Sequence, residues 1–362
     1  MSSRTRFRNI RDAMVPCLLF AGVFVVCAAS ISTILRHRAG VPEMSVLSPK
    51  LAAYQSQPDA YDTLFVGTSR TFYHIVPEVI ESSAAEYGCP DLRVFNFGVF
   101  GLTGAEQDWL VDQILDAGQG HLRAIVLEDP LPEARATREA TSTRARFFNS
   151  TGNAGRRIAS IMSYPESIAK KVYRIGVLGY GMAYDLSGVG RAATVAFPAA
   201  VPDVPETLNL SQDGFEALGS VPTDDILARH KDFEDNPAKF ADALARYGAP
   251  SNEKVEPRAV YIASRIKALE ARGINAALYI SPDPLELDRT PRVGEAVRAL
   301  MPETTVIDLN RPDEYPDLFE RGIWFDFSHV GEEGARRLSR HAGQELCEGL
   351  KQGRRGVTDA VR

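Results

Sequence analysis

The sequence predicts an α/β protein, a three-layer sandwich with a mainly parallel central sheet, preceded by one transmembrane helix. Short apolar runs that end in glycine or polar residues alternate with helical stretches over residues 62–130. The alternation returns over residues 258–350, and such a rhythm is typical of βαβ units around a parallel sheet. The membrane helix is predicted at residues 13–35, which are uncharged and long enough to cross a bilayer, since about 20 apolar residues suffice.

The charges that flank this stretch predict its orientation. Four arginines lie between residues 4 and 11, and two follow at 36 and 38. The positive-inside rule therefore places residues 1–12 in the cytoplasm and exports the body, as in a single-pass protein of the inner membrane with a periplasmic domain. We expect an uncleaved anchor, because the stretch is longer than a usual signal-peptide core. A cleaved signal peptide with its site near residues 28–30 is the alternative.

The first α/β half follows a proline-containing segment. Residues 36–60 show little periodicity and are predicted to be a linker. Beyond it, buried strands are indicated by short apolar runs, and helices by apolar residues at helical spacing. Strands are expected at 63–66, 92–97 and 124–127, and helices at 76–87 and 105–117.

The second half resumes after an insertion. Residues 131–257 show no series of strands, and we expect a helical subdomain or cap there, with helices near 152–175, 223–231 and 236–247. The sandwich as a whole is expected to cover residues 61–350, followed by a frayed polar tail at 351–362. Its later elements are expected to be helices at 258–272, 292–300 and 332–350 and strands at 276–280 and 304–309.

Composition and cysteine positions limit the possible functions. The net charge of −6 gives no basic excess, so nucleic acid is not an expected partner. The absence of an H-E-x-x-H motif and of a tight His/Cys cluster predicts no metal site, and no cofactor is expected. Cys17 and Cys27 lie in the apolar stretch. An oxidising compartment would allow Cys89 and Cys347 to pair, but we expect two isolated thiols.

Ser69 is the candidate nucleophile. It lies in Gly67-Thr68-Ser69-Arg70, directly after the first strand. A sharp turn into a helix projects a serine from a rigid backbone and points N–H groups outward, where they bind an oxyanion. Capping of the next helix by Thr68 or Ser69 is the alternative. The threonine at position 71 excludes the G-x-S-x-G elbow of α/β-hydrolases.

Asp326 and His329 are the candidate acid and base, in a loop before the last helix. His329 is suited to take the Ser69 proton, and Asp326 to hold the imidazole in the required tautomer. Capping of the last helix by Asp326 or Ser328 is the alternative. Because active sites of open parallel sheets gather beyond the carboxyl ends of the strands, we expect Ser69 and this loop to meet at one edge.

Two further features follow strand ends. The run from Asn96 to Gly104 contains glycines that let the backbone approach a ligand. Its G-x-x-G-x-x-G spacing, without a P-loop lysine, argues against a nucleotide site. Glu128 and Asp129 follow the third strand and are candidates to bind a cation or to support a catalytic residue. We expect them instead to face solvent or cap a turn.

Together the motifs resemble those of SGNH (GDSL-like) hydrolases: LFVGTSR after the first strand, NFGVFG at the second, and DFSH before the last helix. The resemblance covers residues 62–130 and 258–350. It implies an SGNH/flavodoxin-like sandwich with Ser69 as nucleophile and Asp326 and His329 as its partners.

The resemblance also implies an oxyanion hole formed by the backbone N–H groups of Ser69 and Gly98. The third motif of the family usually supplies an asparagine as well, but here the third strand ends in LEDP. Arg70 is the alternative donor. Because the loss of one donor lowers turnover by about 10²–10³, ordinary fast hydrolysis is not expected.

The single N-terminal helix, the exported domain and the late D-x-x-H resemble the membrane-anchored branch of this family. That branch includes proteins of alginate O-acetylation and the teichoic-acid D-alanylation protein, and often works beside a multi-spanning membrane acyltransferase. The resemblance implies a serine-dependent acyl esterase or O-acyltransferase that acts on cell-envelope polysaccharide. A non-catalytic scaffold or binding protein of such an assembly is the first alternative. A lipase or phospholipase, with the insertion as a lid, is the second.

Overall fold

The structure is a computed structural model, in which the chain divides into two compact units. One comprises residues 1–44, 134–155 and 172–204, and the other 45–133, 156–171 and 205–362. The division cuts through the predicted insertion, whose later part belongs to the second unit. The structure describes residues 3–39, 44–118, 121–133, 140–149, 151–188, 210–220, 223–249, 254–287 and 291–360.

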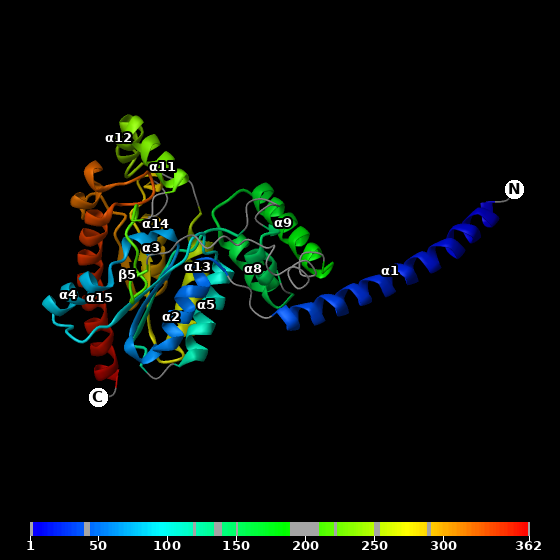
Figure 1. Cartoon of the computed structure of the whole chain (residues 1–362), viewed down its shortest axis with the longest axis horizontal. Helices are drawn as coiled ribbons and strands as arrows, with labels where there is room; N and C mark the ends of the chain where they lie inside the picture. Colours follow the sequence, from blue (N-terminus) through cyan, green and yellow to red (C-terminus); the bar gives the residue numbers. More distant parts are fainter. Residues whose placement is uncertain are drawn as a thin grey trace. The chain divides into compact units, whose positions relative to one another are not determined.

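A five-stranded parallel sheet lies at the centre of the second unit (Figure 1). The strand order is β2-β1-β3-β4-β5, which is consistent with SGNH-like folds and confirms the predicted α/β class. Nearly every strand residue is buried, which explains why the strands read as continuous apolar runs. The strands are β1 (Thr63–Gly67), β2 (Val94–Gly98), β3 (Ala124–Glu128), β4 (Asn275–Ile280) and β5 (Thr305–Asp308).

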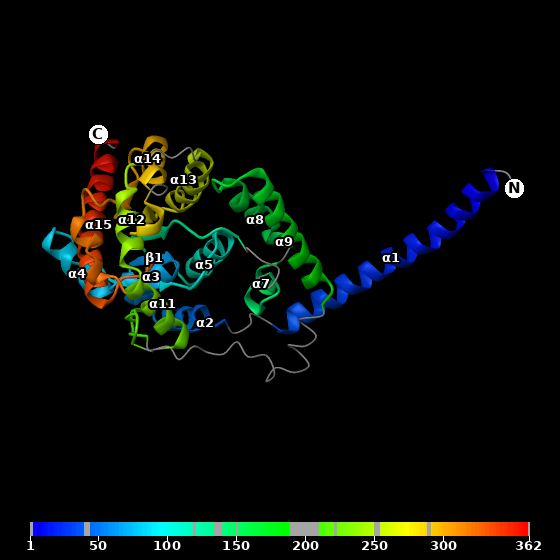
Figure 2. The ribbon, with the colours of Figure 1, turned by 90° about the horizontal axis from the view of Figure 1, so that it is seen from above.

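Helices cover both faces of the sheet (Figure 2). On one face lie α3 (Ser69–His74), α4 (Pro77–Glu86) and α15 (Glu332–Ala360). On the other lie α5 (Gly104–Ala117), α13 (Glu256–Glu270) and α14 (Pro291–Leu300). Successive side chains of β3 point to opposite faces of the sheet, which fits this arrangement. Val126 packs in the core with α4 and α15, whereas the next residue, Leu127, lies beside α5 and α13.

Cys89 and Cys347 form a disulfide between the loop after α4 and α15. The expectation of two isolated thiols was therefore wrong. The two cysteines are 258 residues apart in the sequence, but α4 and α15 pack side by side and bring them together. A pairing of this kind depends on the tertiary fold and leaves no local signal.

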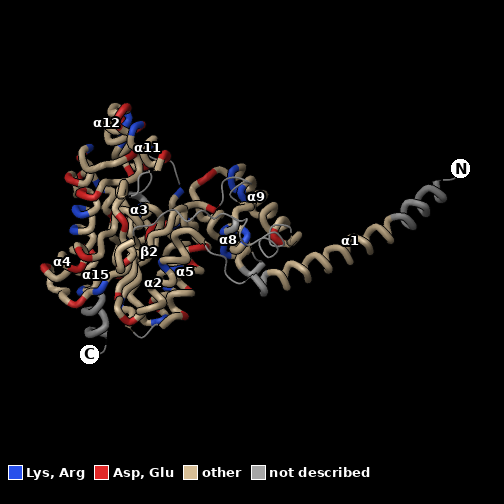
Figure 3. Tube along the Cα trace, viewed as in Figure 1, with Lys and Arg blue, Asp and Glu red and all other residues tan. Residues whose placement is uncertain are grey.

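In the first unit, α1 (Ser3–Ala39) carries the predicted membrane segment. Residues Met14–Leu35 have a mean hydropathy of 2.4, and most of them lie exposed, as Phe20 does with 74% of its surface. They carry no charge (Figure 3). A helix of a soluble core would bury such residues. The exposed apolar helix and the disulfide indicate a membrane-anchored or secreted extracytoplasmic domain.

Helices replace two segments that the sequence predicted to be irregular. The expected linker 36–60 contains α2 (Leu47–Ser56), in which Leu47, Lys50 and Tyr54 are buried at helical spacing. The periodicity was not recognised in the sequence, because a lysine occupies one of the buried positions. In the expected tail, α15 continues as far as Ala360, with no proline to interrupt it, and residues 361–362 lie outside the described residues.

The insertion contains separate short helices. The single helix expected at 152–175 is two, α8 (Thr151–Ser163) and α9 (Ile168–Leu186). Pro165 separates them, because proline lacks the N–H that continues a helix and disfavours helical geometry in the residue before it. Among its described residues, the insertion also contains α7 (Thr143–Phe148), α11 (Asp224–Asp235) and α12 (Pro237–Ala245).

Candidate active site

Two glycines fix the position of Ser69 at the carboxyl edge of the sheet. Ser69 is the first residue of α3, directly after β1. A Cβ atom on Gly67 would lie 2.0 Å from Thr71 Oγ1, and one on Gly98 would lie 2.0 Å from the Phe72 nitrogen. Any larger residue would therefore push α3 away from the ends of β1 and β2. Glycine at both positions lets the helix start directly on the sheet and holds the serine there.

The three predicted catalytic residues lie together. Ser69 Oγ is 2.9 Å from His329 Nε2, and His329 Nδ1 is 3.0 Å from both carboxylate oxygens of Asp326. An ionised carboxylate only accepts hydrogen bonds, so Nδ1 carries the proton and Nε2 of the neutral ring is free to accept one from the serine. His329 and Asp326 are buried, whereas Ser69 is partly exposed.

The loop geometry orients Asp326. Its Oδ1 accepts hydrogen bonds from the backbone N–H groups of Ser328 and His329, at 2.7 and 2.8 Å. Oδ2 accepts one from Arg229 Nη1 at 3.0 Å. Burial acts to raise the pKa of Asp326. The pKa of this carboxyl is nevertheless held below its usual range. The carboxylate is stabilised by the hydrogen bond and electrostatic attraction of His329, by the Ser328 N–H and by the Arg229 guanidinium.

The second part of the insertion supports this loop. Arg229 comes from α11, and the neighbouring His230 places Nδ1 2.8 Å from the carbonyl of Phe325. The His230 ring stacks on the Phe325 ring at 4.4 Å. Phe233 packs edge-on against Phe327, so two aromatic contacts join α11 to the loop. No sequence signal predicts these contacts, because the insertion shows no recognisable motif.

A second buried histidine lies behind the first. His74 Nε2 accepts a hydrogen bond from the Val330 N–H, so the proton of the neutral ring is on Nδ1, which donates to Ser281 Oγ at 2.8 Å. Burial lowers the pKa of His74 well below its usual value, and the neighbouring His329 and Arg70 act in the same direction. His74 therefore stays neutral and acts as a packing partner of the His329 ring, whose centroid is 5.9 Å away.

Glu128 holds the turn that carries Ser69. Its carboxylate accepts five hydrogen bonds, from the N–H and hydroxyl groups of Thr68 and Thr71 and from Arg70 Nε, at 2.6–3.3 Å. Glu128 does not face solvent, because only 2% of its surface is exposed. It caps the first turn of α3, which was the other part of the expectation. A buried carboxylate requires such donors, and the first turn of α3 supplies them.

Asp129 also differs from the prediction. It pairs with Arg258, which is buried in α13 and whose Nε lies 2.8 Å from Asp129 Oδ1. The same guanidinium lies over the Tyr164 ring at 4.4 Å. Asp129 therefore anchors α13 to the end of β3. Within the described residues, no cluster of His, Cys, Asp or Glu side chains is arranged to hold a metal ion.

Arg70 is occupied by two carboxylates. Besides its bond to Glu128, its Nη1 lies 2.7 Å from Asp283 Oδ2. Burial raises the pKa of Asp283 to about 6, although the Arg70 charge acts in the opposite direction. Arg70 therefore links the turn that carries Ser69 to the loop after β4.

The predicted oxyanion donors have different surroundings. The Gly98 N–H donates to Asn96 Oδ1 at 2.8 Å. Asn96 also donates from Nδ2 to the carbonyls of Thr71, Phe72 and Ile75, and its Oδ1 accepts a bond from Nζ of the buried Lys50. The Arg70 and Phe72 N–H groups donate to Oγ1 and the carbonyl oxygen of Thr68, within the turn, and the Thr71 N–H donates to Glu128 Oε2. Of the N–H groups in the first turn of α3, that of Ser69 alone has no acceptor among the described residues.

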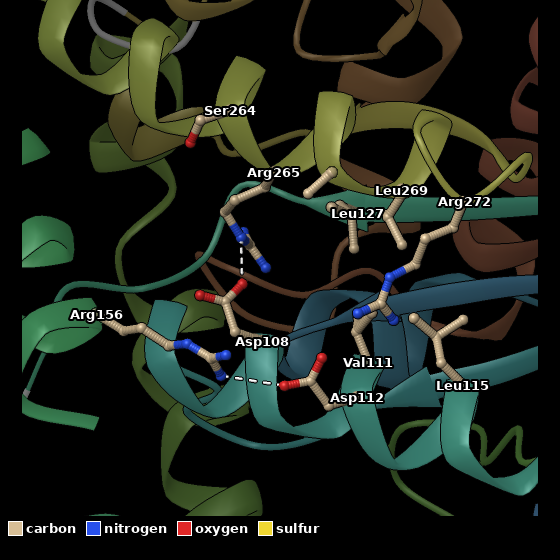
Figure 4. A pocket seen from close by; sticks show the side chains of 11 residues that line it. Asp108, Val111, Asp112, Leu115, Leu127, Arg156, Ser264, Arg265, Leu269 and Arg272 are labelled. Atoms are coloured by element: carbon tan, nitrogen blue, oxygen red, sulfur yellow. Dashed lines mark hydrogen bonds and ion pairs between the residues drawn. The ribbon is translucent and has the colours of Figure 1, made fainter. Parts of the chain in front are cut away.

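A surface pocket of about 240 Å³ lies elsewhere, between α5 and α13 (Figure 4). Ion pairs cross it, from Arg265 to Asp108 at 2.5 Å and from Arg156 to Asp112 at 3.1 Å. None of the predicted site residues lines this pocket.

Comparison with known proteins adds no assignment. No protein-family model matches this chain, and no curated protein matches it either.

Proposed function

We propose that this chain is a serine-dependent acyl esterase or O-acyltransferase that acts on a cell-envelope polysaccharide or a similar acylated polymer. The observation that carries the proposal is the contact of Ser69 Oγ with His329 Nε2 at 2.9 Å, while Asp326 lies on the other ring nitrogen. A hydroxyl on an imidazole that is oriented by a carboxylate is the arrangement that activates serine toward acyl groups.

In the proposed reaction, Ser69 Oγ attacks the carbonyl carbon of an acyl ester and its proton passes to His329 Nε2. Asp326 stabilises the imidazolium. The tetrahedral intermediate collapses, the alcohol leaves with the proton from His329, and the acyl group stays on Ser69. A sugar hydroxyl or water then gives its proton to His329 Nε2 and attacks the acyl carbon. His329 returns that proton to Ser69 Oγ as the acyl–serine bond breaks, which restores the free serine.

The oxyanion of this intermediate needs donors, and the Ser69 N–H is the best placed. The Gly98 N–H and the Arg70 side chain already bond to Asn96 and to Glu128 and Asp283. A hole with fewer free donors supports a slow esterase, or a transferase whose acceptor is positioned by a partner, better than a fast hydrolase.

The cellular setting in this proposal comes from α1 and from the resemblance to the membrane-anchored branch of SGNH proteins. With the N-terminus in the cytoplasm, α1 is a single-pass anchor in the inner membrane and the sheet domain is periplasmic. A multi-spanning membrane acyltransferase is the proposed partner, because it would deliver the acyl group across the bilayer.

One observation favours a second candidate, a non-catalytic scaffold on the same fold. Glu128 stands where the family has its asparagine donor, and the Gly98 N–H is bonded to Asn96. Such a protein would bind the acylated polymer without hydrolysing or transferring its acyl groups.

A serine-directed fluorophosphonate separates the two candidates. We expect the full chain in detergent to be labelled at Ser69, and labelling to be lost in Ser69→Ala and His329→Ala. Ser82→Ala, which removes an exposed hydroxyl on α4, is the matched control and should label normally. Melting curves check that each variant is folded. A folded parent chain that takes no label, and does not hydrolyse small acetyl esters, would favour the scaffold.

A further inference from the structure

Helix α9 turns an apolar face outward and a polar one inward. Val172, Tyr173 and Tyr180 expose 64%, 57% and 48% of their surfaces. The buried side of the same helix contains Arg174 and Asp185, with Val177, Leu178 and Gly181. A surface helix of a soluble protein has the opposite arrangement, so α9 is built to meet an apolar medium.

The composition of this exposed face fits the boundary of a bilayer. It contains no acidic residue and a single cation, Lys170. Aromatic rings with a polar tip and lysines with a long apolar stem are the side chains that membrane interfaces favour. The exposed residues are Ile168, Ala169, Lys170, Val172, Tyr173, Ile175, Gly176, Gly179, Tyr180, Ala183, Leu186 and Ser187.

The carboxyl end of α9 is bonded to the membrane segment. Ser32 lies inside the apolar stretch of α1, is 3% exposed, and donates from Oγ to the Asp185 carbonyl at 2.9 Å. A Cβ atom on Gly188 would lie 3.7 Å from Leu35 Cδ1, so the chain after α9 also contacts the end of this stretch. Both contacts lie within the first unit, and they place the end of α9 where α1 would leave the bilayer.

We propose that the exposed face of α9 lies in the headgroup region of the same bilayer that α1 crosses. The protein then contacts lipid at two places, through α1, which spans the bilayer, and through α9, whose carboxyl end is bonded to the end of the apolar stretch of α1. This inference rests on the membrane insertion of α1 in the proposed function, and the experiment separates the two.

Tryptophan fluorescence in proteoliposomes tests the inference. Tyr173→Trp and Tyr180→Trp place a reporter on the face, and Phe24→Trp places one in the middle of α1. Tyr87→Trp, on an exposed residue after α4, is the matched control outside the first unit. Emission of each variant is compared with that of the parent chain, in lipids brominated near the headgroups or near the centre of the bilayer.

We expect the α9 reporters to lose about half of their added emission in lipids brominated near the headgroups, and less in lipids brominated near the centre. Phe24→Trp should show the reverse depth preference, and Tyr87→Trp no quenching. Quenching at Phe24→Trp without quenching at either α9 position would overturn the inference and leave the anchor intact. No quenching at Phe24→Trp would overturn the anchor itself. Unquenched α9 reporters with a crosslink between two α9 helices would assign the face to a second copy of the chain.

Discussion

The two halves of the candidate site are held in different ways. The Ser69 turn is fixed by the sheet itself, through two glycines and the five hydrogen bonds of Glu128. The Asp326–His329 loop is fixed by α11 of the insertion, through Arg229 and His230. Arg229 is partly exposed, whereas Glu128 is fully buried. The candidate nucleophile is therefore held by the core, and the candidate acid–base pair is held by a more exposed element that is easier to alter.

The largest expected effect on the labelling rate comes from a change of Asp326, the candidate acid. Asp326→Asn removes the charge that stabilises the imidazolium and lets His329 adopt the wrong tautomer, so the labelling rate should fall about 10³–10⁴-fold in a folded protein. Fluorophosphonate labelling over time measures this. Asp317→Asn changes a second carboxylate that pairs with a histidine, His341, and should label at the parent rate. A fall of less than tenfold in Asp326→Asn would contradict the assigned role.

Glu128→Gln tests the other half of the candidate site, the Ser69 turn. An amide accepts fewer of the five hydrogen bonds and removes one of the two carboxylates that pair with Arg70, so we expect a loss of about 3–5 kcal/mol in the free energy of unfolding. The labelling rate of the folded fraction should also fall by about tenfold, because the Ser69 turn loosens.

Glu133→Gln provides the matched control for this change. Glu133 is equally buried and pairs with Arg157 at 3.0 Å, but it does not touch the Ser69 turn. We expect a comparable loss of stability by urea unfolding with the labelling rate preserved. Equal labelling of the two variants would show that Glu128 contributes stability alone.

Arg229→Gln should have a smaller effect, which sharpens the contrast between the halves. Arg229 is about a third exposed, so the loss in stability should stay below about 1 kcal/mol. Arg229 helps to hold the pKa of Asp326 low. Its removal raises that pKa, so the acid-side fall of the labelling rate should begin at higher pH. Arg336→Gln, on an exposed ion pair with Glu78, should leave the profile unchanged.

Asp283→Asn should have the smallest effect on the reaction and a clear effect on the pH dependence of stability. Burial raises the pKa of Asp283 from 3.8 to about 6, so the folded state binds this proton more tightly than the unfolded state. Its contribution to the free energy of unfolding therefore falls as pH rises between about 4 and 6 and is constant above. Relative to the parent, the variant should gain up to a few kcal/mol across that window. Urea unfolding at several pH values checks this, and an unchanged difference would contradict it.

The sequence predicted the sheet well and the helices less well. Buried parallel strands are short apolar runs, so β1 and β3 were found to within a residue at each end. The helix α2 was missed because Lys50, a residue that usually faces water, is buried at the centre of its apolar face and bonds to Asn96. No periodicity analysis predicts a buried lysine without its acceptor.

In the candidate site, too, some residues could be predicted from the sequence and others could not. Ser69, Asp326 and His329 were predictable because each follows a strand or precedes a helix at the same edge, and the structure brings them together. The burial of Glu128 was not predictable, since a carboxylate after a strand usually faces water. Arg229 lies 97 residues from its partner, in a segment with no motif, and only the tertiary fold shows the contact.

The Cys89–Cys347 disulfide has a consequence for a chain that is cut. Ser69 precedes the first cysteine, and His329 lies between the two. A single proteolytic cut within the insertion would leave the serine on one fragment and the histidine on the other, with one half of the cystine on each. The two fragments would stay covalently joined, migrate as one species until a reductant is added, and retain both partners of the site in one molecule.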